Sequence, residues 1–168
     1  RIYMYHDFKK RLPSFMDPVN RYSFVVNAFI TASKYGRDYD RLTELANFCS
    51  HFTAHFTELA DDWMGAIRAL CSSKANHGFT HLLDKVDVSD CSNHYALSTF
   101  AVLLATKYCF SIPKMISELI NGVFPTIMKN NGRSRSAGYK MDYETEPNVC
   151  LALLFLAQMN CSSDDPFI

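Results

Sequence analysis

The stretch that decides the fold runs from Asp38 to Asp90. It reads DYDRLTELANFCSHFTAHFTELADDWMGAIRALCSS, then a short polar break, then GFTHLLDKVDVSD. Four apolar residues in it recur at positions i, i+4, i+7 and i+8: Trp63, Ile67, Leu70 and Cys71. This spacing places them on one face of an α-helix. Trp63, the only tryptophan of the chain, is expected to be buried against the preceding helix, near Phe52 or Phe56.

Capping residues and helix breakers indicate where the other helices begin and end. Asp17 before Pro18 is typical of a helix start, and Gly36 of a helix end. Pro125 is expected to bend or end a helix. We expect helices over 17–36, from 38 or 40 to 56, from the candidate cap Thr57 to 72, over 79–85, from Ser89 or Ser92 to 108, over 111–125, and from about 145 to 160.

The apolar faces of these helices follow from the same periodicity. The second helix carries a stripe of Leu42, Leu45, Cys49, Phe52 and Phe56. The long fifth helix carries Tyr95, Phe100, Leu103, Leu104 and Tyr108, and the sixth carries Met115, Ile116, Leu119 and Ile120.

The order of these elements predicts an all-α fold. Short links join the helices in pairs, in units of roughly 35 to 45 residues, which is typical of antiparallel helical hairpins in HEAT-like or armadillo-like repeats. We expect residues 1–168 to form a single all-helical segment of a larger protein, best supported over 17–125. The stretch 130–140 is expected to be a flexible loop that folding does not require, since its composition lacks apolar side chains to bury.

Composition and charge exclude several classes of protein. Hydrophobic residues make up 48% of the chain, enough for a core. Seventeen basic and 17 acidic residues balance, so no overall field favours nucleic acid or an anionic membrane. The longest apolar run, 149–157, is half of the roughly 18 residues that a membrane helix needs.

The six cysteines are widely spaced along the chain, at Cys49, Cys71, Cys91, Cys109, Cys150 and Cys161. Small secreted disulfide scaffolds concentrate their cysteines in short, loop-rich chains. We interpret these six as reduced, buried thiols that behave as small hydrophobic side chains.

Two histidine pairs have a spacing that could place both rings on one metal ion. His51 and His55 lie one helical turn apart near Cys49, and His77 and His81 lie between Cys71 and Cys91. Structural zinc sites, however, bring cysteine ligands in pairs at short spacing. No glutamate follows His51 to act as a base, so we expect no metal or other cofactor.

No motif for catalysis is apparent. The adjacent carboxylates Asp61–Asp62 and Asp164–Asp165 cannot face one substrate from a helix, and the first pair is expected to complement a helix dipole. Phosphate-binding glycine loops, the GxSxG elbow and kinase signatures are absent. Cys71 and Cys109 have no histidine base at a recognisable spacing. We therefore predict a protein that is not an enzyme, with no catalytic, cofactor-binding or metal-binding residue.

Two further clusters have ordinary structural interpretations. A basic loop carries Lys129, Arg133, Arg135 and Lys140 with Ser134 and Ser136, and is interpreted as a solvated linker, although phosphate contact or phosphorylation is an alternative. The aromatic residues Phe48, Phe52, Phe56, Trp63 and Phe79 are interpreted as core or as a helix–helix interface, because they recur at helical spacing.

Three blocks of sequence carry a resemblance to a known family. WMGAIRALCSS, VDVSD and HYALSTF resemble, in this order and spacing, subunit 12 of the Mediator complex, over about residues 38–120. The resemblance implies an extended helical scaffold in the dissociable kinase module of Mediator, acting in the nucleus on transcription by RNA polymerase II. It implies partners in Mediator subunit 13, cyclin C, a cyclin-dependent kinase and core Mediator, with no direct contact to nucleic acid or membrane.

Two alternatives remain open at this point. One is a generic helical-repeat adaptor outside Mediator, which recovery of unrelated partners in a nuclear pull-down would favour. The other is a small metal-dependent enzyme that uses the histidine and cysteine positions, which elemental analysis would detect.

Overall fold

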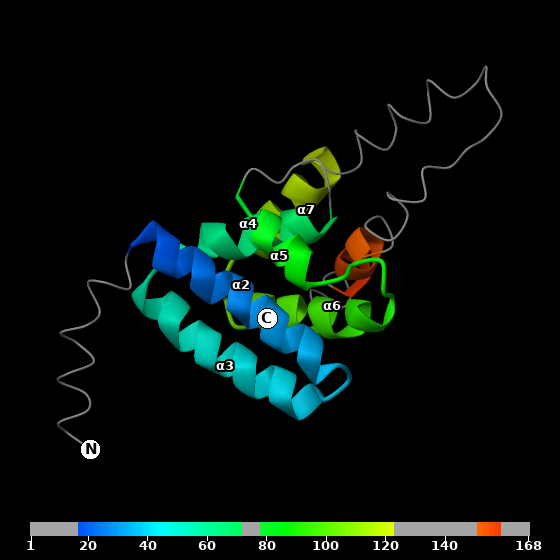
Figure 1. The fold of residues 1–168 in the computed structure, drawn as a ribbon. Helices are drawn as coiled ribbons and strands as arrows, with labels where there is room; N and C mark the ends of the chain where they lie inside the picture. The colour runs from blue at the N-terminus through cyan, green and yellow to red at the C-terminus, as the bar shows by residue number, and fades with distance from the viewer. Residues whose placement is uncertain (1–16, 72–77, 123–150, 159–168) are drawn as a thin grey trace, which may run out of the picture.

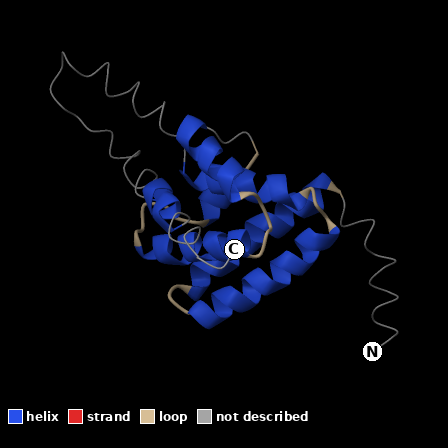
Figure 2. Cartoon of the chain, turned by 180° about the vertical axis from the view of Figure 1, so that it is seen from behind, coloured by secondary structure: helices blue, strands red, loops and turns tan. Residues whose placement is uncertain are grey.

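The computed structural model describes residues 17–71, 78–122 and 151–158, and every regular element within these ranges is an α-helix (Figure 2). The helices are α2 (Pro18–Tyr35), α3 (Tyr39–His55), α4 (Leu59–Cys71), α5 (Thr80–Lys85), α6 (Ser92–Thr106) and α7 (Ile112–Gly122). Residues 151–158 are also helical. The prediction of an all-α chain is confirmed over the described residues.

The capping signals at the first two helices act as predicted. The Asp17 carboxylate accepts a hydrogen bond from the Val19 amide at 3.0 Å, with Pro18 in the first turn. Gly36 ends α2 with φ of +58°, in the region that only glycine adopts without strain. The Asp38 carboxylate then accepts from the Arg41 amide at 3.1 Å and begins α3.

The helices pack around α6 and α4. Helices α2 and α3 lie side by side, and α6 crosses against both of them (Figure 1). Helix α2 also contacts α4 and α5, while α7 packs against α4. Ten of the fifteen α6 residues are buried, among them the polar residues His94, Ser98 and Thr99, so burial extends around most of this helix and is not confined to one face.

Trp63 is at the centre of the core, with 0% of its surface exposed. Its indole Nε1 donates to the hydroxyl of Thr53 at 2.9 Å, so it is fixed to the preceding helix α3 as predicted. Three aromatic rings from α2 and α6 surround it in addition: Phe24 at 5.8 Å, Phe29 at 6.1 Å and Phe100 at 6.3 Å between ring centroids. All four residues of the predicted stripe are buried.

A glycine lets α5 approach α4. A methyl group added at Gly65 would lie 2.8 Å from Cε2 of Phe79, closer than carbon atoms can approach. The Phe79 ring in turn stacks on Tyr22 of α2, with centroids 4.9 Å apart. The absence of a side chain at position 65 therefore allows Phe79 to join α2, α4 and α5.

The start of α6 differs from the prediction. The sequence predicts Ser89 or Ser92 as the capping residue, but Cys91 occupies the N-cap position and makes no side-chain hydrogen bond. The side chains of the neighbouring aspartates take the local amides instead: Asp87 accepts from Ser89 and Asp90 from Ser92, each at 2.9 Å. The turn before α6 is thus built by aspartates within it, and the serines are donors.

Five residues that were predicted to lie on apolar faces, in the aromatic interface or as buried thiols are exposed instead. Tyr95 of α6 is 36% exposed and Ile120 of α7 is 49% exposed. Tyr108 lies beyond the end of α6 and is 84% exposed. Phe48 is 53% exposed on the outer side of α3, and Cys91 is exposed. At each of these positions the residue type favoured burial, but the described helices leave the side chain exposed.

Several predictions fall outside the described residues. They concern the polar break at 72–77, His77, the loop 130–140 with its basic residues, Asp164–Asp165, and the cysteines Cys150 and Cys161. The last predicted helix is described only over 151–158. Within the part of the chain that the structure describes, no helix is long and apolar enough to cross a membrane.

Candidate interaction surface

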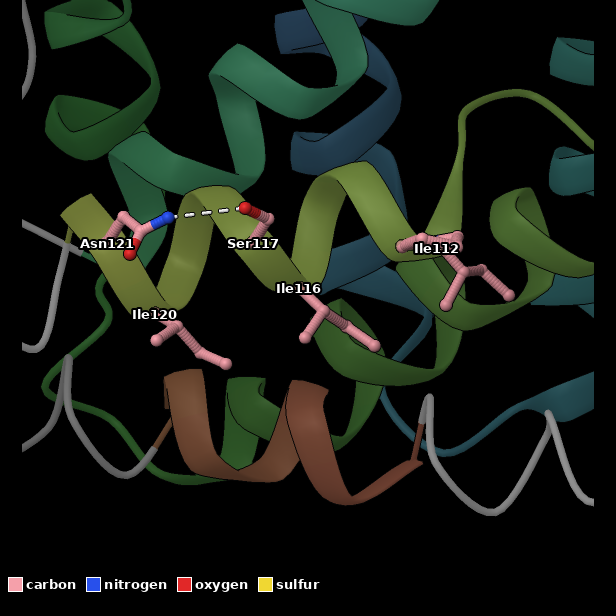
Figure 3. A pocket seen from close by; sticks show the side chains of 6 residues that line it. Ile112, Ile116, Ser117, Ile120 and Asn121 are labelled. Atoms are coloured by element: carbon pink, nitrogen blue, oxygen red, sulfur yellow. Dashed lines mark hydrogen bonds between the residues drawn. The ribbon is translucent and has the colours of Figure 1, made fainter.

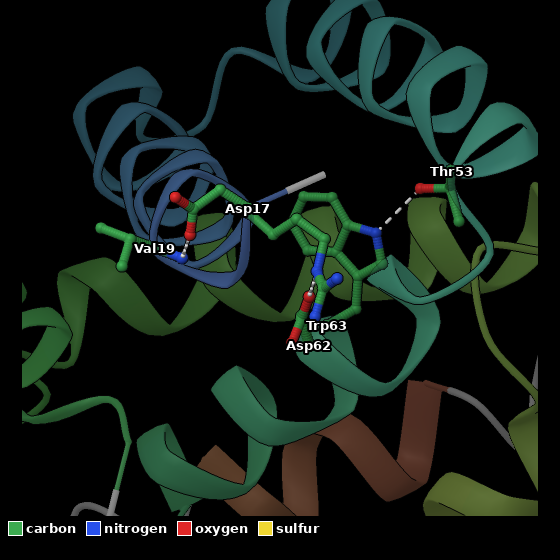
Figure 4. A network of polar contacts seen from close by, with 6 residues as sticks. Asp17, Val19, Thr53, Asp62 and Trp63 are labelled. Atoms are coloured by element: carbon green, nitrogen blue, oxygen red, sulfur yellow. Dashed lines mark hydrogen bonds and ion pairs between the residues drawn. The ribbon is translucent and has the colours of Figure 1, made fainter. Parts of the chain in front are cut away.

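The first turn of α4 connects two other helices through its carboxylates. The Arg21 guanidinium of α2 binds Asp62 at 3.0 Å, with both side chains largely buried (Figure 4). The Lys114 ammonium of α7 binds Asp61 at 2.9 Å in a more exposed pair. The carboxylates lie at the helix N-terminus, as predicted, and complement its dipole. Their partners lie 41 and 53 residues away in sequence, so no local pattern identifies them.

A third ion pair joins α4 to α7. Arg68 lies 3.4 Å from Glu118, whose Oε2 is buried and makes no hydrogen bond. With the Lys114–Asp61 pair, this places both charged residues of α7 on the side that faces α4. The opposite side of α7 is left without charge.

That opposite side of α7 forms an open, apolar groove. Its described lining residues all belong to α7: Ile112, Pro113, Ile116, Ser117, Ile120 and Asn121 (Figure 3). The three isoleucines follow one another at intervals of four residues, a helical ridge. Ile120 is 49% exposed, whereas Met115 and Leu119 on the α4 side are buried.

The buried cysteines are poor nucleophiles. Burial raises the pKa of the Cys49 thiol to about 12, with the nearby Cys109 thiol adding to the shift. Burial also raises the pKa of Cys71 and brings that of Cys109 to about 11, against the opposing hydrogen bond from Thr53 and the charge of Lys107. Since the thiolate is the reactive form, these thiols are unreactive at neutral pH. The prediction of free, buried thiols is confirmed for these three residues.

Two of the described histidines make hydrogen bonds with nearby groups. Nδ1 of His51 lies 2.7 Å from the Asn47 carbonyl oxygen. His81 makes no such bond to Asp84, since Nδ1 lies 3.7 Å from its carboxylate, beyond hydrogen-bond distance. His94, which the sequence analysis did not single out, is buried and donates from Nε2 to the Val88 carbonyl at 2.7 Å. Among residues 17–71, 78–122 and 151–158, no three histidine, cysteine or acidic side chains gather closely enough to hold a metal ion.

The predicted aromatic interface extends to the surface. Phe52 lies between Phe24 and Phe48, with centroids 5.2 Å and 4.9 Å away, and Phe24 contacts Trp63. Phe56 and Trp63 are buried, and Phe52 and Phe79 are partly buried against the core. The interpretation as core and helix–helix interface is confirmed for these four, and Phe48 is the exposed end of the cluster.

Together these features describe a packed helical unit with an exposed apolar edge. The buried thiol of Cys49 is protonated at neutral pH, Asp61 and Asp62 are paired with cations, and the groove along α7 is an uncharged isoleucine ridge. Such an arrangement fixes the shape of a helical unit and presents apolar side chains at its edge.

Comparison with known proteins shows what the sequence resembles. Mediator of RNA polymerase II transcription subunit 12 from Caenorhabditis elegans is 39% identical over 97% of the chain, and the Caenorhabditis briggsae protein is 39% identical over 88%. The human Mediator subunit 12-like protein is 41% identical over 60% of the chain. The chain spans only 4% to 5% of the length of these proteins.

No protein-family model matches the sequence, and no solved structure matches the chain significantly. The similarity to the nematode proteins extends well beyond the stretch 38–120 that first carried the resemblance. The chain is therefore related to a segment of Mediator of RNA polymerase II transcription subunit 12.

Proposed function

We propose that this chain is a non-catalytic, helical scaffold segment of the Mediator kinase module, which regulates transcription by RNA polymerase II through protein–protein contacts in the nucleus. The observation that carries the proposal is the 39% identity to nematode Mediator subunit 12 over nearly the whole chain. The proposed partners are Mediator subunit 13, cyclin C, a cyclin-dependent kinase and core Mediator.

The physical character of the segment supports a scaffold role. Ion pairs link α4 to α2 and to α7, and a fully buried tryptophan of α4 contacts residues of α2, α3 and α6. A rigid unit of this kind can present a surface to a partner without reorganising, which lowers the entropic cost of association.

We further propose that the helices are part of a HEAT-like or armadillo-like array of antiparallel hairpins. The α2–α3 pair, of 18 and 17 residues joined by a three-residue link, is the size of one such hairpin. In an array each unit buries its open side against the next, and the ridge of α7 is a side of this kind.

Cross-linking mass spectrometry on purified nuclear Mediator tests the proposed function. The lysines Lys34, Lys85 and Lys114 lie on different helices and report separate faces of the segment. We expect cross-links from them to kinase-module subunits. Absence of the protein from Mediator fractions would overturn the proposal, and cross-links that stay within subunit 12 itself would overturn the contact role.

Metal content separates the proposal from the enzymatic alternative. Elemental analysis of the purified chain should find no stoichiometric zinc, and a chelator should leave the melting temperature unchanged. One zinc per chain, with loss of the fold on chelation, would favour the metal-dependent alternative.

A further inference from the structure

A second concave site lies away from the α7 groove, next to the most exposed aromatic side chain of the described residues. This pocket, of about 270 Å³, lies between the end of α3, the start of α4 and the link from α6 to α7. Its lining residues are Ser50, Thr53, Ala54, Thr57, Ala60, Lys107, Tyr108 and Cys109. The volume is below that of a pocket for a drug-sized molecule and suits a single side-chain group.

The backbone at Tyr108 is in an unusual conformation. The Cys109 amide donates to the Leu104 carbonyl at 3.0 Å and the Tyr108 amide to Ala105 at 3.0 Å, which is the hydrogen-bond pattern of a Schellman cap. The position that Tyr108 occupies in this cap requires a left-handed residue, and Tyr108 has φ of +60°. Glycine is the usual residue there, because a side chain in this region is strained.

The tyrosine gains nothing in the interior that would offset this strain. Its side chain is 84% exposed, so it contributes little to the core. A residue with a strained backbone whose side chain does not stabilise the core is a candidate for a role in function. Tyr108 is one of the residues that line the pocket, so a group bound there would lie next to it.

The chemistry of the pocket favours an anion. Lys107 is half-buried and forms no ion pair with a described residue, while Arg21, Arg68 and Lys114 each have a carboxylate partner. No carboxylate is among the described residues that line the pocket. Glu58 and Asp61 are sequence neighbours of the lining residues Thr57 and Ala60, and Asp61 is paired with Lys114. Lys107 is therefore the charged residue among the described residues that line the pocket.

Two hydroxyl groups add hydrogen-bond donors. The hydroxyls of Ser50 and Thr53 already donate to main-chain carbonyls of α3. The hydroxyls of Thr57 and Tyr108 make no hydrogen bond with another described residue and remain available. A lysine and two hydroxyls can bind the oxygens of a carboxylate or a phosphate group.

We infer that the pocket beside Tyr108 binds a carboxylate or phosphate group carried by a partner protein, with Lys107 as its counter-ion and Tyr108 as its aromatic edge. This inference refines the proposed scaffold function, on which it rests for the existence of a partner. Titration with small anions tests it without any partner, so a failure here would leave the proposed function standing.

The structure supplies a reporter for the titration. The single indole Nε1–H signal of Trp63 belongs to a group that donates to Thr53, a residue of the pocket wall. Nuclear magnetic resonance titrations of the chain with sodium acetate and with inorganic phosphate, at constant ionic strength, should shift this signal and the Tyr108 amide in a saturable manner. Saturation by acetate alone indicates a carboxylate partner, and by phosphate alone a phosphorylated one.

Two variants and a control decide the outcome. Lys107→Ala should weaken anion binding at least fivefold, whereas Lys34→Ala, which removes an exposed lysine of α2, should leave it unchanged. Tyr108→Gly should raise the melting temperature and weaken binding. Non-saturating shifts, equal affinity in Lys107→Ala, or a lower melting temperature in Tyr108→Gly would each overturn the inference.

Discussion

Helices α4 and α7 have the same kind of sequence and very different surroundings. Both carry an apolar stripe at helical spacing. In α4 every residue of the stripe is buried, while in α7 the stripe is buried at Met115 and Leu119 and open at Ile120. The difference lies in their neighbours, because α4 packs against α2, α5 and α7, whereas the outer side of α7 forms an open groove. Amphipathic periodicity thus specifies a helix but not how much of it is covered.

The largest expected effect on stability comes from truncating Trp63, the buried tryptophan of α4. Trp63→Ala should lower the free energy of unfolding by about 3–5 kcal/mol, because it leaves a large cavity among the rings of Phe24, Phe29 and Phe100. Urea denaturation followed by circular dichroism measures the loss. Phe48→Ala, which truncates a half-exposed ring, is the control and should cost much less. Equal costs would mean that the core is not centred on α4.

Alkaline pH should weaken the same region. Burial raises the pKa of Cys49 and Cys71 above the ordinary thiol value of 9.0, so the unfolded chain loses these protons first. Their contribution to stability is fully present below pH 9 and is lost as the pH rises above it, by on the order of 1 kcal/mol for each thiol at pH 10. Urea melts at pH 7 and pH 10 measure the loss, and Cys71→Ala should reduce it. An unchanged loss in that variant would contradict the assignment.

Loss of the hydrogen bond between Trp63 and Thr53 should destabilise the fold, because it leaves the buried indole N–H of Trp63 without an acceptor. Thr53→Val keeps the shape of the side chain but removes the oxygen that accepts from the buried indole N–H. An unsatisfied buried donor costs about 1–3 kcal/mol. Thr53→Ser keeps a hydroxyl and should recover part of this loss. If the Thr53→Val and Thr53→Ser variants had the same urea midpoint of unfolding, the hydrogen bond would contribute nothing to the stability of the fold.

The two ion pairs of the α4 N-terminus should differ according to exposure. Side chains in the Arg21–Asp62 pair are 19% and 26% exposed, against 54% and 77% in the Lys114–Asp61 pair. Double-mutant cycles with alanine should give a coupling of about 1 kcal/mol for the first pair and less than about 0.5 kcal/mol for the second. A larger coupling energy for the Lys114–Asp61 pair than for the Arg21–Asp62 pair would contradict the order predicted from side-chain exposure.

The smallest effect is expected on the ridge of α7. Ile120→Ser should change the unfolding free energy by no more than about 0.5 kcal/mol, since the side chain is half exposed already. Leu119→Ser, one residue earlier on the buried side, is the matched control and should destabilise strongly. Thermal melts of the two variants compare them directly. Similar losses at both positions would show that the outer side of α7 is covered in the folded chain.

The sequence alone determined the features that depend on a few consecutive residues. Asp17 with Pro18, Gly36 and Asp38 set the ends of α2 and the start of α3, because a cap bonds amides within the next three residues. The stripe from Trp63 to Cys71 predicted the buried face of α4 for the same local reason. The resemblance to Mediator subunit 12 also came from the order of short sequence blocks.

Only the tertiary structure decided which residues meet across the fold. Asp62 pairs with Arg21, and Asp61 pairs with Lys114. These partners are 41 and 53 residues apart in sequence, so helical periodicity does not predict the pairs. Tyr108 and Phe48 have the chemistry of core residues, yet the helices of the described ranges leave both of them exposed. Burial depends on the position of every other element, so it emerges from the packed chain and not from the type of a single residue.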